Sequence, residues 1–237
     1  FLSFYAAILK AMHKHHYLMM ASVASLSNSY RLGGNEAPPS VMSVFSGSTL
    51  YRVFQSILNM KDVKVDSHTQ ESITIVNSLP EIFPDNTDRN RTSPFAFTGN
   101  RFEFRAVGSS QNVASATYII NSVVAESLND FYAQVVELEA SGVERSDAVM
   151  TVVRKFVSEA KDIMFEGNGY SKEWEEESAA RGLRAVKNVP EAYEVYHEAQ
   201  TVELFEKLGV LAKNEIEARF EILNETYVKK LQIEARI

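Results

Sequence analysis

The sequence predicts an α+β fold in which a strand-containing part, residues 1–110, precedes an almost purely helical part, residues 111–237. Two patterns support this division. Residues 101–105 alternate charged and aromatic side chains, which is typical of a half-buried antiparallel strand. Beyond residue 111 the apolar residues recur at helical spacing, and glycine or proline stands near the ends of most runs. We therefore expect two domains: antiparallel strands with flanking helices over 1–110, and helices alone over 111–237.

The first part is predicted to hold two helices and several short strands. Helical spacing marks residues 1–25 and 50–58, and strand patterns mark residues 41–45, 72–76, 94–97 and 101–107. The last two strands are expected to pair through the turn residues Thr98, Gly99 and Asn100. Residues 27–39 contain two glycines and two prolines, which favour a loop.

The second part is predicted to hold five helices, each with a recognisable start or end. They cover residues 113–140, 147–165, the stretch after Ser171, the stretch from Pro190 to just before Gly209, and residues 214–236. Serine caps the free N–H groups of a first turn, so Ser171 is the expected N-cap of the third helix. Gly182 is its expected C-terminal cap, and Pro190 is expected at the first position of the fourth helix.

Composition excludes several classes of protein. The chain has 24 Lys and Arg against 31 Asp and Glu, a formal charge of −7, which argues against a nucleic-acid-binding surface. No apolar run approaches the roughly 20 residues of a membrane-spanning helix. The absence of cysteine excludes disulfides and thiol nucleophiles. Because the chain opens within a helical pattern and without Met, we expect it to be a piece of a longer polypeptide.

The strand that begins at Arg101 carries the charged side chains best suited to binding a ligand. A period of two places Arg101, Glu103 and Arg105 on one face, about 7 Å apart in succession. Two guanidinium groups beside a carboxylate suit a polyanionic ligand together with a hard divalent cation. The alternative is an ordinary solvated face with cross-strand ion pairs, and the pattern alone favours that alternative.

Three other segments carry weaker signals. Arg31 and Glu36 lie in a glycine-hinged loop that could close over a site, and Arg91 stands at the end of a charged loop before a strand. Residues His13, His15 and His16 do not form a metal motif, because only the first and last share a helix face and no carboxylate completes the set. We expect an exposed or partly packed histidine cluster.

Taken together, these segments resemble the type III glutamine synthetases. The similar stretches are residues 31–39, 85–105, 167–171, 181–183 and 227–236, so the resemblance extends over essentially the whole chain. It identifies residues 1–110 with the C-terminal part of the catalytic domain and residues 111–237 with a helical C-terminal region. It also implies ATP-dependent ligation of ammonia to the side chain of glutamate through a γ-glutamyl phosphate.

The resemblance implies a role for each charged residue named above. Catalytic roles fall to Glu36, which would close the glutamate site and accept a proton from ammonium, and to Arg91, which would stabilise the transferring phosphoryl group and contact ATP. Arg31 and Arg105 would bind glutamate and its phosphorylated form. ATP phosphates would lie near Arg101, and Glu103 would be a ligand of Mg²⁺ or Mn²⁺.

The resemblance also implies partners and a location. Glutamate, ammonia and ATP would be the substrates, the full protein would form a ring-shaped homo-oligomer in the cytoplasm, and no nucleic acid or membrane would take part. Alone, the chain is expected to bind Mg²⁺-ATP poorly and to make no glutamine, since one carboxylate cannot hold the cations. Two alternatives remain open: a ligase joining glutamate to another amine, and a non-catalytic helical oligomerisation module formed by residues 111–237.

Overall fold

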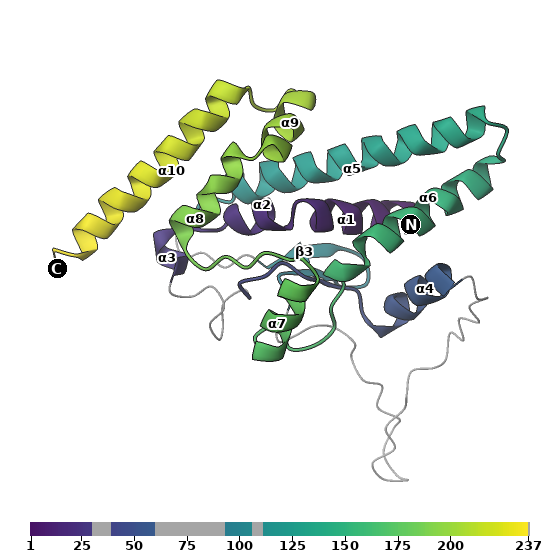
Figure 1. The fold of residues 1–237 in the computed structure, drawn as a ribbon, viewed down its shortest axis with the longest axis horizontal. Helices are drawn as coiled ribbons and strands as arrows, with labels where there is room; N and C mark the ends of the chain where they lie inside the picture. Colours follow the sequence, from purple (N-terminus) through teal and green to yellow (C-terminus); the bar gives the residue numbers. More distant parts are fainter. Residues whose placement is uncertain (30–38, 60–92, 106–110, 237) are drawn as a thin grey trace, which may run out of the picture.

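The computed structural model describes residues 1–29, 39–59, 93–105 and 111–236, and this part of the chain is mostly helical with one small mixed sheet (Figure 1). Up to residue 105 the elements are α1 (Leu2–Lys14), α2 (His16–Ala21), α3 (Leu26–Ser29), β1 (Val44–Phe45), α4 (Ser48–Asn59), β2 (Phe95–Phe97) and β3 (Phe102–Phe104). From residue 111 they are α5 (Ala114–Ala140), α6 (Arg145–Ala160), η1 (Lys161–Ile163), α7 (Lys172–Ala180), α8 (Val189–Tyr193), η2 (Glu194–His197), α9 (Ala199–Lys207) and α10 (Lys213–Glu234).

The sheet has the order β1-β2-β3, and its hairpin is the predicted one. β2 and β3 pair antiparallel with Ala96 opposite Glu103, and the turn between them contains Gly99 at a φ of +92°. Glycine suits this turn because it adopts positive φ without steric cost. The expectation of antiparallel strands fails for β1, which pairs parallel with β2. A connection of nearly fifty residues separates β1 from β2, long enough for the crossover that parallel pairing requires.

One large apolar core joins the sheet to the helices. Tyr5 of α1 lies against Phe97 and Phe102 of the hairpin, with ring centroids 5.3 and 4.9 Å away. The same cluster of buried side chains includes Ile119 of α5 and Phe156 of α6, so α1 packs between the sheet and this helical pair (Figure 1). The division at residue 110 stays a prediction, and packing across it is continuous.

The predicted helices are present, but two of them are interrupted. The first breaks at His15, whose φ of −115° and ψ of 26° separate α1 from α2. The fourth is divided into α8, η2 and α9, because Glu198 has an extended ψ of 135° between η2 and α9. Pro190 lies in the first turn as expected, although the helix begins one residue earlier, at Val189.

The predicted caps of α7 are confirmed. The Ser171 hydroxyl accepts a hydrogen bond from the Trp174 amide at 3.1 Å, and Gly182 ends the helix at a φ of +79°. The predicted strand over residues 72–76 lies outside the described residues. Within the described ranges, no helix combines the length and apolar character that crossing a membrane requires.

Candidate functional site

The candidate site is the outward face of β3, and we call Arg101, Glu103 and Arg105 the β3 charged strip. Glu103 Oε1 lies 2.7 Å from Arg101 Nη2 and 2.9 Å from Arg101 Nε. The other carboxylate oxygen, Oε2, lies 3.3 Å from Arg105 Nε. Each oxygen of Glu103 is therefore held by a different arginine.

The opposite face of β3 anchors the strip. Phe102 stacks on Phe95 with ring centroids 5.5 Å apart and meets Phe97 at 5.1 Å, while Phe104 lies 6.3 Å from Phe95. These contacts hold one side of the strand on the core, and the pleat turns the charged side chains the other way. The predicted separation of an aromatic face from a charged face is confirmed.

Exposure falls steeply along the charged strip. The Arg101 side chain is 66% exposed and that of Glu103 is 31% exposed, whereas that of Arg105 is 12% exposed. A hydrogen bond from Arg101 is the main influence on the pKa of Glu103; together with Arg105 it outweighs the opposing effect of burial and lowers that pKa below its ordinary value. Glu103 is therefore ionised at neutral pH, and an anionic ligand from solvent reaches Arg101 first.

The ion pairs differ from the simple alternative considered for this strand. That alternative predicted pairs across strands, but the pairs of the charged strip run along β3 itself, between residues two apart. On β2, Ala96 lies opposite Glu103 and offers no charge. Among the described residues, the strip therefore combines two cations and one anion, whose charges sum to +1.

The remaining predicted site residues cannot be compared with the strip. Arg31, Glu36 and Arg91 all lie outside the described residues. Of the predicted set, the structure brings together Arg101, Glu103 and Arg105. The convergence of the other three on the same place stays a prediction.

The charged strip offers a divalent cation the right type of ligand, but too few ligands to hold it. A carboxylate is the ligand type that Mg²⁺ and Mn²⁺ prefer, and Glu103 supplies at most two oxygens. Within the described ranges, no group of three or more His, Cys, Asp or Glu side chains could hold a metal ion. Glu103 could therefore contribute to a metal site that other ligands complete.

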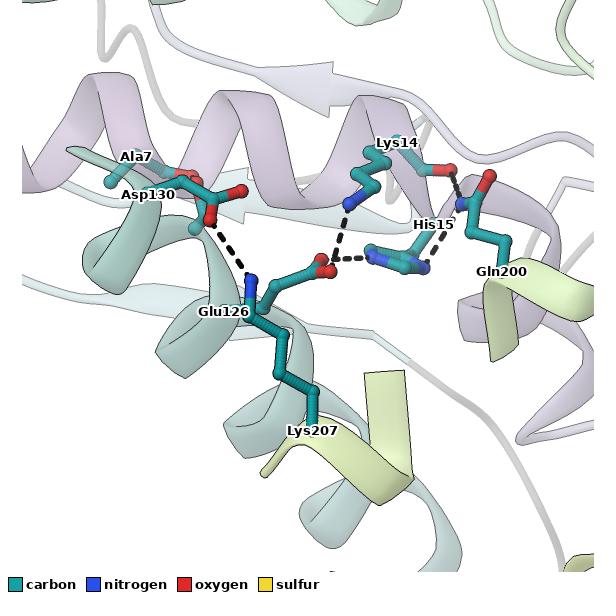
Figure 2. Close-up of polar contacts among 8 residues, drawn as sticks. Ala7, Lys14, His15, Glu126, Asp130, Gln200 and Lys207 are labelled. Carbon is teal, nitrogen blue, oxygen red and sulfur yellow. Dashed lines mark hydrogen bonds and ion pairs between the residues drawn. The ribbon is translucent and has the colours of Figure 1, made fainter. Parts of the chain in front are cut away.

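A buried polar network that the sequence did not predict connects α1 and α2 to α5 and α9 (Figure 2). His15 Nε2 lies 2.6 Å from one carboxylate oxygen of Glu126, and Lys14 donates to the other at 2.8 Å. Gln200 donates to the Lys14 carbonyl at 2.7 Å and lies 3.2 Å from His15 Nδ1. The prediction of an exposed or partly packed cluster is wrong for His15, which is only 2% exposed, because it lies at the break between α1 and α2 and faces α5.

The hydrogen bonds assign the protons of this network. The Lys14 carbonyl accepts only, so the amide nitrogen of Gln200 must point toward it and toward His15 Nδ1. His15 therefore accepts at Nδ1 and donates from Nε2 to Glu126. Burial tends to raise the pKa of Glu126, but the hydrogen bonds from His15 and Lys14 and the positive charge of Lys14 outweigh it and lower that pKa to about 2.

The sequence does contain a pattern that indicates burial of Glu126. It stands seven residues after Ile119 and three after Val123, both fully buried, which places it on the inward face of α5. A charged residue on such a face needs a buried partner. The sequence cannot name that partner, because His15 lies 111 residues away.

Comparison with known protein families first gives a match for the C-terminal part of the chain. Residues 148–237 match the family model of the glutamine synthetase C-terminal domain.

Individual relatives then extend this similarity to the whole length of the chain. A glutamine synthetase of Bacteroides fragilis is 41% identical over 239 aligned positions, covering 100% of this chain and 33% of the relative. A type-3 glutamine synthetase of Dictyostelium discoideum is 40% identical over 99% of this chain and 32% of its own length, and a glutamine synthetase of Butyrivibrio fibrisolvens is 36% identical over 99% and 33%. The chain is similar to these glutamine synthetases along its whole length, and the predicted resemblance, type III included, is confirmed. It spans about a third of the length of these relatives.

Proposed function

We propose that this chain is part of an enzyme that ligates ammonia to the side-chain carboxylate of glutamate, with ATP, to give glutamine. The observation that carries the proposal is the β3 charged strip, which presents two guanidinium groups and an ionised carboxylate on one face. Similarity to proteins named glutamine synthetase along the whole chain supports it. The proposed reaction brings negatively charged phosphate and carboxylate groups close together. A face with two guanidinium groups is suited to neutralising their charge.

Each member of the strip has a proposed part. Arg101, the most exposed, would bind the nucleotide phosphates, and Arg105 would hold the glutamate substrate and its γ-glutamyl phosphate. Glu103 would contribute carboxylate oxygens to Mg²⁺ or Mn²⁺, which when bound supplies charge neutralisation to the transferring phosphoryl group. The same proposal gives Arg91 a role at that phosphoryl group, and it gives Arg31 and Glu36 the glutamate-binding and proton-accepting roles.

The proposal extends to the setting of the reaction. The full protein would act as a ring-forming homo-oligomer in the cytoplasm, with residues 1–110 contributing to the catalytic domain and residues 111–237 forming the helical C-terminal region. On its own, this chain would bind Mg²⁺-ATP poorly, because Glu103 is the single carboxylate of the strip.

A hybrid enzyme tests the proposal. In it, this chain replaces the matching third of the Bacteroides fragilis relative. We expect the hybrid to form glutamine from glutamate, ammonia and ATP, and the chain alone to form none. A folded hybrid with the melting temperature of its parent but no glutamine formation would contradict the proposal.

A smaller exchange covers the case of a hybrid that does not fold. Residues 93–105, which carry the β2–β3 hairpin, would be transferred alone into the relative. Activity in this second hybrid is expected, because the hairpin holds the whole charged strip. Glutamine formation by the chain alone would contradict the proposed need for further metal ligands.

A further inference from the structure

A polar cavity of about 210 Å³ lies beside the break between α1 and α2, where α9 begins, and we call it the Arg184 cavity. Three residues of the buried network, Lys14, His15 and Gln200, line it (Figure 2). Since one water molecule takes about 30 Å³ in the liquid, the cavity has room for a small organic molecule. The described residues that line it include none of the β3 charged strip.

Arg184 supplies the cation that a ligand in this cavity would meet first. Its guanidinium carbon lies 3.6 Å from the centroid of the Tyr17 ring, so one face of the planar group rests on an aromatic side chain. The Arg184 side chain is 47% exposed, and its Nη1 donates to Glu198 at 2.6 Å. A guanidinium group has five N–H donors, so this contact leaves donors for a second oxyanion. Lys14 also lines the cavity, but its ammonium group donates to Glu126.

Thr201 supplies an uncharged donor inside the cavity. The residue is 2% exposed and lines the cavity, and its hydroxyl makes no hydrogen bond to a described residue. Within the described ranges, Trp174 Nε1 is the fully enclosed side-chain atom that lacks a partner, so the Thr201 hydroxyl must reach the cavity space. A buried hydroxyl without a partner costs free energy, and a ligand that brings an acceptor oxygen would satisfy it.

The charges and the apolar wall of the cavity define the class of ligand. Lys14 and Arg184 against Glu198 give the lining side chains a summed charge of +1, which favours an anion. The buried side chains of Leu18 and Val195 form an apolar part of the wall. An inorganic anion would leave this apolar wall in contact with water, whereas an organic anion covers it.

We propose that the Arg184 cavity binds a small organic carboxylate. Its carboxylate group would accept hydrogen bonds from the Arg184 guanidinium and the Thr201 hydroxyl, and its apolar part would lie against Leu18 and Val195. The inference goes beyond the proposed function, because the site is separate from the β3 charged strip and needs neither ATP nor a metal ion.

Methyl NMR spectra of the chain measure this binding without any enzymatic assay. Sodium butyrate is titrated into the isotope-labelled chain at constant ionic strength, and the methyl signals of Leu18, Val195 and Thr201 are followed. The methyl groups of Ile222, which is exposed on α10, serve as the reference for non-specific contact. We expect saturable shifts at the three cavity residues and none at Ile222.

Two further ligands separate a carboxylate site from other kinds of site. Butyramide has nearly the shape of butyrate but no charge, and sodium sulfate has charge but no apolar part. We expect butyrate to bind at least about tenfold more tightly than either, because only butyrate offers both a charged acceptor and an apolar chain.

Two substitutions test the two proposed donors separately. Arg184→Gln removes the cation, and Thr201→Val removes the hydroxyl while keeping the shape of the side chain. Each is expected to weaken butyrate binding about tenfold, since each removes a hydrogen bond to a charged group. Arg145→Gln, which removes an exposed arginine 3.8 Å from Glu139 on another part of the chain, should bind butyrate as the unmodified chain does.

Several outcomes would overturn the inference. Shifts that do not saturate, or that are equal at Ile222, would show non-specific contact only. Equal affinity for sulfate would show a general anion site, and equal affinity for butyramide would show that charge plays no part. Unchanged butyrate affinity in both Arg184→Gln and Thr201→Val would place the ligand elsewhere on the chain.

Discussion

Glu126→Gln tests the buried network by removing its charge while keeping the size of the side chain. Folding lowers the pKa of Glu126 from 4.5 to about 2, which corresponds to about 3 kcal/mol of folding stability at neutral pH. A glutamine amide would also place its own N–H group against one of the two donors, His15 or Lys14. We therefore expect the substitution to lower the free energy of unfolding by about 3 kcal/mol at pH 7.

The pH dependence distinguishes this electrostatic account from a loss of packing. A carboxylate with a lowered pKa stabilises the fold fully above its unfolded pKa of 4.5, and the contribution is lost as the pH falls toward about 2. The difference between the chain and Glu126→Gln should therefore fall below half of its neutral value at about pH 3. Urea unfolding at pH 7, 4.5 and 3, followed by circular dichroism and by the fluorescence of Trp174, measures it.

A matched control lies on the same helix. Glu137 of α5 is exposed, so Glu137→Gln should change the free energy of unfolding by no more than about 0.5 kcal/mol. The reasoning would be refuted if Glu126→Gln cost less than about 1 kcal/mol at pH 7 or if its cost did not change with pH.

Three further substitutions test local features by urea unfolding at pH 7. Ser171→Ala removes the hydroxyl that accepts from the Trp174 amide and should cost about 1 kcal/mol; no change would refute the cap. Tyr5→Phe removes a buried 2.8 Å donation to the Ser46 hydroxyl and should also cost about 1 kcal/mol; equal or greater stability would show that this hydrogen bond contributes nothing. Gly99→Ala places a side chain at a φ of +92° and should cost about 1 kcal/mol through backbone strain alone, since the space there is open; a neutral result would contradict that strain.

The features that the sequence predicted correctly depend on neighbours along the chain. The β2–β3 hairpin follows from alternating side chains around a glycine turn, and the start of α7 follows from Ser171. The two faces of β3 follow from the same alternation. Such local patterns act over a few residues, so they can be read without knowledge of the fold.

The features that were missed depend on contacts between distant residues. Helical spacing alone gives no reason for α1 to end at His15, because that side chain is held by Glu126, which is 111 residues away. The parallel pairing of β1 with β2 likewise depends on a distant partner. Sequence patterns predict which face of an element is buried, but they do not identify what covers it.

The candidate site shows the same limit. Its three described residues were predicted to share a face, and they do. Their pairing along the strand was not predicted, because side-chain direction within a face depends on which charges are nearby. The positions of Arg31, Glu36 and Arg91 relative to this face stay predictions.

The central claim is that the β3 charged strip serves ligands rather than stability, and one comparison in the hybrid enzyme tests it most directly. Glu103→Gln is expected to reduce the rate of glutamine formation by about 100-fold or more, equivalent to about 3 kcal/mol of transition-state stabilisation, while the melting temperature stays unchanged. Glu139→Gln, at another arginine-paired glutamate, should leave both unchanged. Full glutamine formation by the Glu103→Gln hybrid, or a fall in melting temperature that accounts for its loss, would contradict the claim.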